Sequence, residues 1–415
     1  MAEEGVKFEY AFTCQPVCGP ARACLQTGRY ATETGCYRND IAPFKPERYL
    51  AEYFNEAGYE TAYVGKWHLA STGGESSTDI GPIMDYQTKA VPPELRGGYK
   101  DFWIASDVLE FTSHGYDGYM YDKDMNKREF KGYRADCTTD FALEYLRNKT
   151  SDHPFFMTIS YIEPHHQNDH NTYEGPAGSD KKFENYEVPG DLIGTGGDWK
   201  EHYPNYLGCC NSLDMNLGRL RAELARLGLS ENTIILYASD HGSHFRTRNA
   251  EYKRSCHDGC IRIPMVIHGP GFMGGKVVDN LVSLMDVPPT LLACAGIEKP
   301  NQMRGNTLQK IVMGDSSDWP EEVFLQISES QVGRAIRTNK WKYSVSAPDK
   351  NGQLDASSDR YVEEYLYDLE KDPHEKNNLV QDAALMNVRG ELSGILKRRM
   401  AEAGEAVPVI SAGRT

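Results

Sequence analysis

NSLDMNLGRLRAELARLG (residues 211–228) and TIILYASD (233–240) follow one another along the chain and decide the fold class. The first stretch has apolar residues at helical spacing and ends at Gly228, a residue typical of a helix C-cap. The second is a short apolar run, as expected for a strand that is buried on both faces. An amphipathic helix followed by a buried strand is the repeating unit of an α/β fold.

The same alternation recurs on both sides of this stretch. Helices are predicted around 46–57 and at 141–149, and strands at TAYVGKW (61–67), FFMTISYIEP (155–164) and IRIPMVIHGPG (261–271). We therefore predict an α/β protein with a large, mainly parallel sheet flanked by helices. The segment 70–135 is rich in Gly, Tyr and Asp with little periodicity, which predicts long loops near a site.

The pattern changes after about residue 315. VGRAIRTNKWKYSV (332–345) and EEYLYDLEKDPHEKNNL (363–379) alternate apolar and polar residues, as antiparallel strands with one solvated face do. A terminal helix is predicted around 381–401. We expect a catalytic domain at 1–315 and a small C-terminal subdomain at 316–415, with an antiparallel sheet and a helix.

Composition excludes some classes of function. The formal net charge is −15, from 60 acidic and 45 basic residues, which argues against a nucleic-acid surface. No apolar run approaches the length of a membrane span. The ten cysteines include no C-x-x-C pair, so we expect reduced thiols and a cytoplasmic location.

CGPARACLQTGR (18–29) carries the strongest chemical signal. A lone cysteine such as Cys18 would be read as a small buried apolar residue. The whole string, however, resembles the type I sulfatase signature C-x-P-S-R-x-x-x-L-T-G-R, with departures at Ala21 and Gln26. The resemblance implies the alkaline-phosphatase-like fold and covers nearly the whole chain.

This resemblance also implies a mechanism. In the family the cysteine is oxidised to formylglycine by a maturation enzyme, and one hydroxyl of the hydrated aldehyde attacks sulfur. The second hydroxyl then lets the aldehyde re-form and expel sulfate, an exit that a serine would lack. Cys18 would be the modified residue, and Arg22 would anchor it.

Two further motifs supply candidate catalytic residues by the same resemblance. In GKWHL (65–69), Lys66 would bind a sulfate oxygen and His68 would lie near the nucleophile, although a surface lysine beside a packed histidine is the alternative. In YIEPHHQND (161–169), His165 follows the carboxyl end of a strand, where open α/β sheets bind ligands. The family's pattern assigns His165 to the sulfate or the leaving-group oxygen.

YASDHGSH (237–244) resembles the family's metal motif, so Asp240 and His241 would bind a divalent metal together with residue 18. Ca²⁺ is the first expectation, and Mg²⁺ or Mn²⁺ is possible because imidazole suits transition metals better. In KRSCHDGCIRIP (253–264), Lys253 would stabilise charge on the departing ester oxygen. His257 is a candidate for either substrate contact or packing.

The leaving-group pocket is predicted from the aromatic segment 99–121. Aromatic faces stack on sugar and aryl rings, so Trp103 and His114 are expected to contact the substrate together with His257.

Family members begin with a strand that ends in two adjacent metal-binding aspartates, followed by a helix ending in L-A-E-E-G-V-x-F. This chain begins MAEEGVKFEYAF, so we expect that its start is an internal methionine or that it is a fragment. The metal would then keep only Asp240, His241 and the oxygen of residue 18.

The sequence predicts hydrolysis of a sulfate monoester, with a sulfated small molecule or sugar as substrate. A phosphonate or phosphate ester hydrolase of the same superfamily is an alternative, because tetrahedral oxyanions of similar size are hard to distinguish by motif. A metal-poor, non-catalytic binding homologue is a third possibility.

Overall fold

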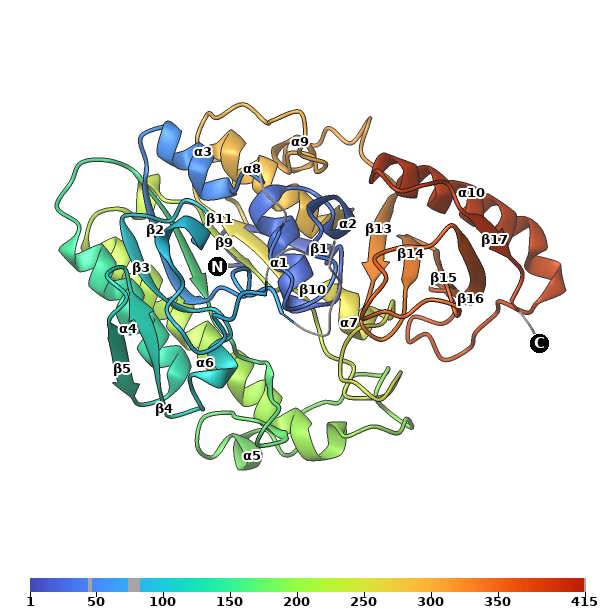
Figure 1. The fold of residues 1–415 in the computed structure, drawn as a ribbon, viewed down its shortest axis with the longest axis horizontal. Coiled ribbons are helices and arrows are strands. Elements are labelled where there is room, and N and C mark those ends of the chain that lie inside the picture. Colours follow the sequence, from blue (N-terminus) through green and yellow to red (C-terminus); the bar gives the residue numbers. More distant parts are fainter. Residues whose placement is uncertain (44–46, 74–82, 414–415) are drawn as a thin grey trace. The chain divides into compact units, whose positions relative to one another are not determined.

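The computed structural model describes residues 1–43, 47–73 and 83–413 (Figure 1). The chain forms two compact units, each described here by itself. Unit 1 comprises Met1–Glu47, Pro189–Gly197 and Ile234–Thr415, and unit 2 comprises Arg48–Val188 and Asp198–Thr233. None of the ten cysteines forms a disulfide, and no helix among the described residues is long and apolar enough to cross a membrane.

A five-stranded sheet organises the first part of unit 1. Its strands are β1 (Val6–Phe12), β9 (Ile235–Ala238), β10 (Arg262–Ile263), β11 (Met265–His268) and β12 (Lys276–Ser283). Strand β1 lies in the middle, with β12 parallel on one side and β10 and β11 antiparallel on the other. The predicted strand at 261–271 is therefore divided into two, at Pro264, which has no N–H to donate to the sheet.

Short helices cover this sheet. They are α1 (Cys18–Thr27), α2 (Ala31–Thr34), α7 (Asp258–Ile261), α8 (Val287–Cys294) and α9 (Gln309–Val312). A core of buried residues from β1, β11 and β12 also includes Ala21 of α1 and Val287 of α8. This packing fixes α1 against the sheet, and α1 begins at Cys18.

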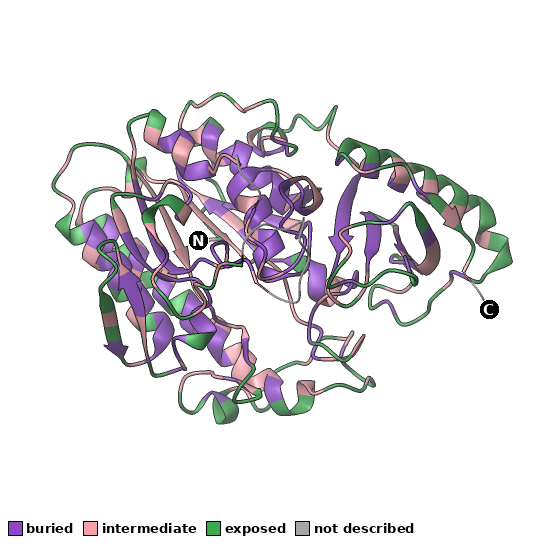
Figure 2. Cartoon of the chain, viewed as in Figure 1, coloured by how far each residue is buried: buried purple, intermediate pink, exposed green. Residues whose placement is uncertain are grey.

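The C-terminal part of unit 1 is a second five-stranded sheet with one long helix. The elements are β13 (Glu322–Ile327), β14 (Gly333–Thr338), β15 (Trp341–Ser346), β16 (Arg360–Asp368), β17 (Val409–Ser411) and α10 (Met386–Glu402). Strands β13 to β16 pair antiparallel, as predicted, and β17 joins β16 in parallel. Helix α10 buries Leu392, Leu396 and Met400 and leaves its other side exposed (Figure 2).

The compact units do not follow the predicted division after residue 315. Phe324, Ile336 and Tyr343 of the C-terminal sheet share one core with Cys24 and Tyr30 from the N-terminal segment. Because these side chains exclude water from one another, the C-terminal sheet belongs to unit 1.

Unit 2 contains the third five-stranded sheet. Its strands are β2 (Glu60–Lys66), β3 (Phe102–Ser106), β4 (Asp117–Asp122), β5 (Lys127–Lys131) and β6 (Phe155–Ser160). Strand β2 pairs in parallel with β3 and β6, whereas β3, β4 and β5 pair antiparallel. The α/β prediction is confirmed, and the sheets are mixed, with parallel pairing concentrated around β2.

Helices and short strands complete unit 2. They are α3 (Leu50–Glu56), α4 (Arg134–Asn148), α5 (Ser179–Lys182), α6 (Trp199–Arg226), β7 (His166–Gln167) and β8 (Thr172–Tyr173). The three predicted helices are present with shifted ends. The prediction of loops at 70–135 is wrong for β3, β4 and β5, and residues 74–82 of that range lie outside the described residues.

Candidate active site

Cys18 lies at the first residue of α1 and is 1% exposed. The preceding Val17 is extended, so the chain turns into the helix at the cysteine, and Gly28 ends the helix in the left-handed region. The N–H of Gly19 donates to Asn39 Oδ1 at 2.8 Å. The signature therefore places its cysteine at a fixed, buried helix start.

The side chains of Lys253 and His241 contact the sulfur of Cys18. Lys253 Nζ lies 2.9 Å from Sγ and His241 Nε2 lies 3.2 Å from it. In a matured protein this sulfur would be replaced by the oxygen of formylglycine, so Sγ marks where that oxygen would stand. The two contacts place a cation and an imidazole nitrogen at one atom.

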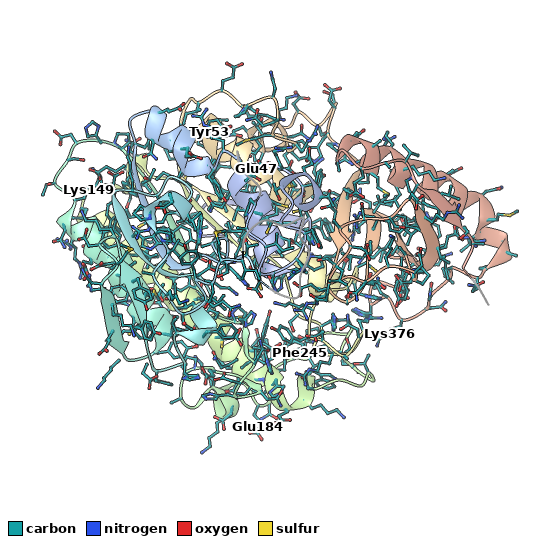
Figure 3. All side chains as sticks on the ribbon, in the orientation of Figure 1. Glu47, Tyr53, Lys149, Glu184, Phe245 and Lys376 are labelled. Carbon is teal, nitrogen blue, oxygen red and sulfur yellow. The ribbon has the colours of Figure 1, made fainter. Side chains whose placement is uncertain are left out.

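Asp240 and His241 follow β9, where the strand ends at Ala238. The main-chain N–H of His241 donates to Asp240 Oδ1 at 3.0 Å, and His241 Nδ1 lies 2.9 Å from the carbonyl oxygen of Gly242. The Nδ1 proton is thereby committed to the carbonyl, so the lone pair is on Nε2, which faces Cys18. The loop continues to Phe245, which is 3% exposed (Figure 3).

The residues predicted to bind metal fit a metal ion. One ligand atom each of Cys18, Asp240 and His241 lies within 4.8 Å of the other two. Arg22 Nε is 3.3 Å from Asp240 Oδ2, so the carboxylate also has a cationic neighbour. A carboxylate, an imidazole lone pair and a residue-18 oxygen are a suitable donor set for a divalent cation.

Lys253 is 2% exposed, and its environment keeps it charged. Burial alone would lower the pKa of Lys253, but the thiolate charge of Cys18 and the nearby Tyr252 raise that pKa above its ordinary value. His244 Nε2 and Asn249 Nδ2 bind the carbonyl oxygen of Lys253 at 3.1 and 3.2 Å. The lysine is therefore held at both its main chain and its ammonium group.

His257 was given two possible roles from sequence, and its contacts favour packing. The side chain is buried, with Nε2 3.1 Å from the Tyr367 hydroxyl and Nδ1 3.2 Å from the Ser255 hydroxyl. Burial lowers the pKa of His257 well below its ordinary value, so the ring is neutral. The predicted substrate contact for this side chain stays a prediction.

Unit 2 supplies the remaining candidates at the carboxyl ends of parallel strands. Lys66 is the last residue of β2 and is 2% exposed, and His68 follows with a φ of 60°. The main-chain N–H of His68 donates to the Asp107 carbonyl oxygen, and the Asp107 carboxylate accepts from the N–H groups of Leu69 and Ala70. Asp107 thus fixes the turn that presents His68.

His165 lies just beyond β6, which is the parallel neighbour of β2. Its Nδ1 donates to the His166 carbonyl oxygen at 2.6 Å and lies 3.7 Å from Glu110 Oε2. A neutral imidazole that donates from Nδ1 carries its lone pair on Nε2.

The two aromatic-segment candidates differ. Trp103 is 1% exposed on β3, stacks on Tyr63 with centroids 5.3 Å apart, and meets Trp67 edge-on. Its predicted place in a leaving-group pocket is corrected, because this ring fills the core of unit 2. His114 is partly exposed and bonds Asp169, and its predicted substrate contact stays a prediction.

Sequence reasoning missed three residues that hold the candidates. Asp107 and Glu110 position His68 and His165, and the buried Lys342 bridges two carboxylates, the partly exposed Asp258 and the buried Glu375. An aspartate directly after a strand, such as Asp107, is a weak signal for a positioning residue. Lys342 lies in an ordinary alternating pattern of a strand. No motif in the sequence distinguished them from solvent-exposed residues.

Comparison with known proteins identifies the family. The family model for sulfatases matches residues 1–297. The chain belongs to the sulfatase family. A second model, N-sulphoglucosamine sulphohydrolase C-terminal, matches residues 250–402. Among curated relatives, the ulvan-active sulfatase of Formosa agariphila is 28% identical, covering 98% of this chain and 76% of that protein.

Solved structures confirm the alkaline-phosphatase-like fold. The sulfatase yidJ from Bacteroides fragilis superimposes with a TM-score of 0.81 at 22% identity, covering 97% of this chain and 89% of that one. A structure in complex with its substrate D-glucosamine-2-N,6-O-disulfate gives 0.73 at 22% identity, with 97% and 92% covered. The phosphonate monoester hydrolase from Silicibacter pomeroyi gives 0.65 at 21% identity, with 97% and 89% covered.

Proposed function

We propose that this sulfatase hydrolyses a sulfate monoester using residue 18 after its oxidation to formylglycine. The observation that carries the proposal is the placement of Cys18 Sγ against Lys253 Nζ and His241 Nε2. Once formed, the hydrated aldehyde supplies a hydroxyl nucleophile and a route for releasing sulfate.

Asp240, His241 and the oxygen at residue 18 are the proposed ligands of a divalent cation, which would supply a fixed positive charge for the sulfate oxygens. Ca²⁺ is our first candidate, and Mn²⁺ and Mg²⁺ compete with it because His241 offers a nitrogen. Arg22 balances the Asp240 carboxylate and holds it in place.

Lys253 is proposed to bind the oxygen at residue 18 and the sulfate group, stabilising the negative charge that grows as the ester bond breaks. Its burial keeps water away from this charge, so the interaction is stronger than on a surface. By the resemblance to sulfatases, Lys66, His68 and His165 of unit 2 are also proposed as catalytic residues, with His165 transferring a proton to the leaving oxygen.

A sulfated sugar is the proposed substrate class. The support comes from proteins similar to this chain, an ulvan-active sulfatase and a structure holding a glucosamine disulfate. The test is a panel of sulfated sugars, steroids and simple aryl sulfates. A preference for steroid or aryl sulfates over every sugar would contradict this substrate class.

Hydrolysis of phosphonate or phosphate esters is the second candidate, because a phosphonate monoester hydrolase shares the fold. Sulfate, phosphate and phosphonate esters of one phenol, tested side by side, separate the two. We expect the largest kcat/KM for the sulfate, and a large preference for phosphate or phosphonate would refute the sulfatase assignment.

The covalent step is tested on the peptide that contains Cys18. In active protein, mass spectrometry should show that this residue has lost sulfur and gained an aldehyde oxygen. Protein from a host without a maturation enzyme should keep the thiol and be nearly inactive. Full activity with an intact thiol would contradict the proposal.

A further inference from the structure

A second group of metal-ligand side chains lies in unit 2 and includes no residue assigned above to catalysis. We name it the His114–Asp169–His170 cluster. His114 Nε2 is 2.8 Å from Asp169 Oδ2, and the two imidazole rings stack with centroids 4.2 Å apart and planes at 9°. One ligand atom from each residue lies within 4.8 Å of the other two.

The cluster brings together two separate segments. His114 precedes β4, whereas Asp169 and His170 form the connection between β7 and β8. Their side chains are 41%, 58% and 48% exposed, so an ion from solution could reach all three. Two imidazole nitrogens and one carboxylate oxygen lie close together, and the nearly parallel rings would turn to bring both nitrogen lone pairs onto one ion.

Asp169 is held by a buried support. Its Oδ1 accepts from Gln167 Nε2 at 2.8 Å, and Gln167 Oε1 in turn accepts from Arg134 at 3.3 Å. Arg134 is 1% exposed and is also paired with Glu163. This chain of contacts turns Oδ2 toward His114, and the hydrogen bonds from His114 and Gln167 lower the pKa of Asp169 to about 2.

His170 has a support of its own. Its Nδ1 donates to Glu174 Oε1 at 2.6 Å, and the other oxygen of Glu174 accepts from the main-chain N–H of Gly115 at 2.6 Å. Gly115 directly follows His114, so one carboxylate ties both histidines. A histidine whose Nδ1–H is bound to a carboxylate has its lone pair on Nε2, the arrangement that is usual for metal-binding histidines.

We propose that the His114–Asp169–His170 cluster binds a divalent transition-metal ion of the Zn²⁺ class. Two imidazoles and one carboxylate are the donors that Zn²⁺ takes in sites with an open fourth position. Ca²⁺ prefers six or more oxygen ligands and is not suited to this set. The ion would take the place of the proton on His114 Nε2, and that proton would move to Nδ1 of the same ring, so the ring stays neutral.

The probe is Zn²⁺ itself, measured by isothermal titration calorimetry. To remove the contribution of the site in unit 1, the titrations use protein carrying Asp240→Ala. We expect one equivalent of Zn²⁺ to bind through the cluster. Co²⁺ in the same protein should give visible absorption bands, a signal independent of activity.

Variants assign the ligands. His114→Ala and His170→Ala should each weaken Zn²⁺ binding by at least ~10–100-fold, and Glu174→Gln should weaken it by roughly the same factor through loss of the support to His170. His153→Ala is the matched control, since His153 is an exposed histidine of unit 2 outside the cluster. His114→Gln and His170→Gln replace the alanine variants if these unfold.

The outcomes are distinct. Loss of one Zn²⁺ equivalent in the cluster variants, with the control unchanged, supports the site. Undiminished Zn²⁺ binding in the His114→Ala/His170→Ala protein, equal binding of Ca²⁺, or no stoichiometric binding at all would overturn it. Because the readout is metal binding, none of these results depends on the proposed sulfatase reaction.

Discussion

Replacing Lys253 with methionine tests the electrostatic argument for the active site most directly. The side chain is 2% exposed and its ammonium lies 2.9 Å from Cys18 Sγ. Two unit charges at that separation interact by about 6 kcal/mol at an effective dielectric constant near 20, which is an upper bound. Removing one preorganised donor to a developing anion costs ~2.7–4 kcal/mol, so kcat should fall ~10²–10³-fold.

Stability should respond differently from activity. Methionine has a similar length and no charge to desolvate, and the hydrated aldehyde proposed at residue 18 is uncharged, so the substitution leaves no buried anion without its partner. We therefore expect the Lys253→Met protein to melt at or above the temperature of the unchanged protein. If Lys253 acts only in the transition state, kcat and kcat/KM should fall together while KM changes little.

The assay is the steady-state hydrolysis of an aryl sulfate, combined with thermal unfolding. Mass spectrometry of residue 18 must show equal conversion to formylglycine in both proteins, because incomplete maturation would also lower kcat. Lys340→Met is the matched control, since Lys340 is a half-exposed lysine with one surface partner, Glu370. A fully matured Lys253→Met protein with unchanged kcat would refute the assigned role.

Four further changes test the site and the fold. Cys18→Ala should reduce kcat by ~10⁴-fold or more with a melting temperature close to that of the unchanged protein, and retained turnover of an aryl sulfate would exclude the covalent route. Burial lowers the pKa of His244 to about 4. As the pH falls from 6.5 to 4, the free energy of unfolding should therefore fall by up to about 3 kcal/mol in the unchanged protein relative to His244→Gln, measured by denaturant titration. Burial raises the pKa of Asp286 to about 6. As the pH rises from 4 to 6, the free energy of unfolding should therefore fall by up to about 3 kcal/mol in the unchanged protein relative to Asp286→Asn. For either residue, a variant whose pH profile runs parallel to that of the unchanged protein would contradict the assignment. Lys342→Met leaves the buried Glu375 without the ammonium that it pairs with and leaves Asp258 with Arg337, so the free energy of unfolding should fall by about 3–5 kcal/mol, whereas an unchanged denaturant midpoint would show that the cation is dispensable.

The sequence identified candidate residues of the first site better than their contacts. Cys18 and the strand-end Asp240–His241 pair occur in short contiguous motifs, and local sequence is enough to recognise them as candidates. The helix that starts at Cys18 was not predicted. The contact of Lys253 with Cys18 joins residues 235 positions apart, and it was not predicted either, because no periodicity encodes a distance of that kind.

The errors in the fold prediction have specific physical causes. The strands β3 to β5 were taken as loops because the segment is rich in Gly, Tyr and Asp, although aromatic residues also favour strands. Trp103 shows the ambiguity: a tryptophan can stack on a sugar or fill a core, and its neighbours Tyr63 and Trp67 decide for the core. Burial is a property of the folded neighbours, and the local sequence did not specify them.

Contacts of the C-terminal sheet bear on the candidate active site. Lys342 on β15 binds Asp258, the first residue of α7, and Glu375 accepts the main-chain N–H of Asp258 at 2.7 Å. These contacts fix the end of the loop that begins at β9 and carries Lys253. The C-terminal sheet therefore supports the geometry of the candidate site, and a shift at Lys342 should reach Lys253 through the main chain of that loop. The separate subdomain expected after residue 315 stays a prediction, and on this view its sheet positions one of the proposed catalytic residues.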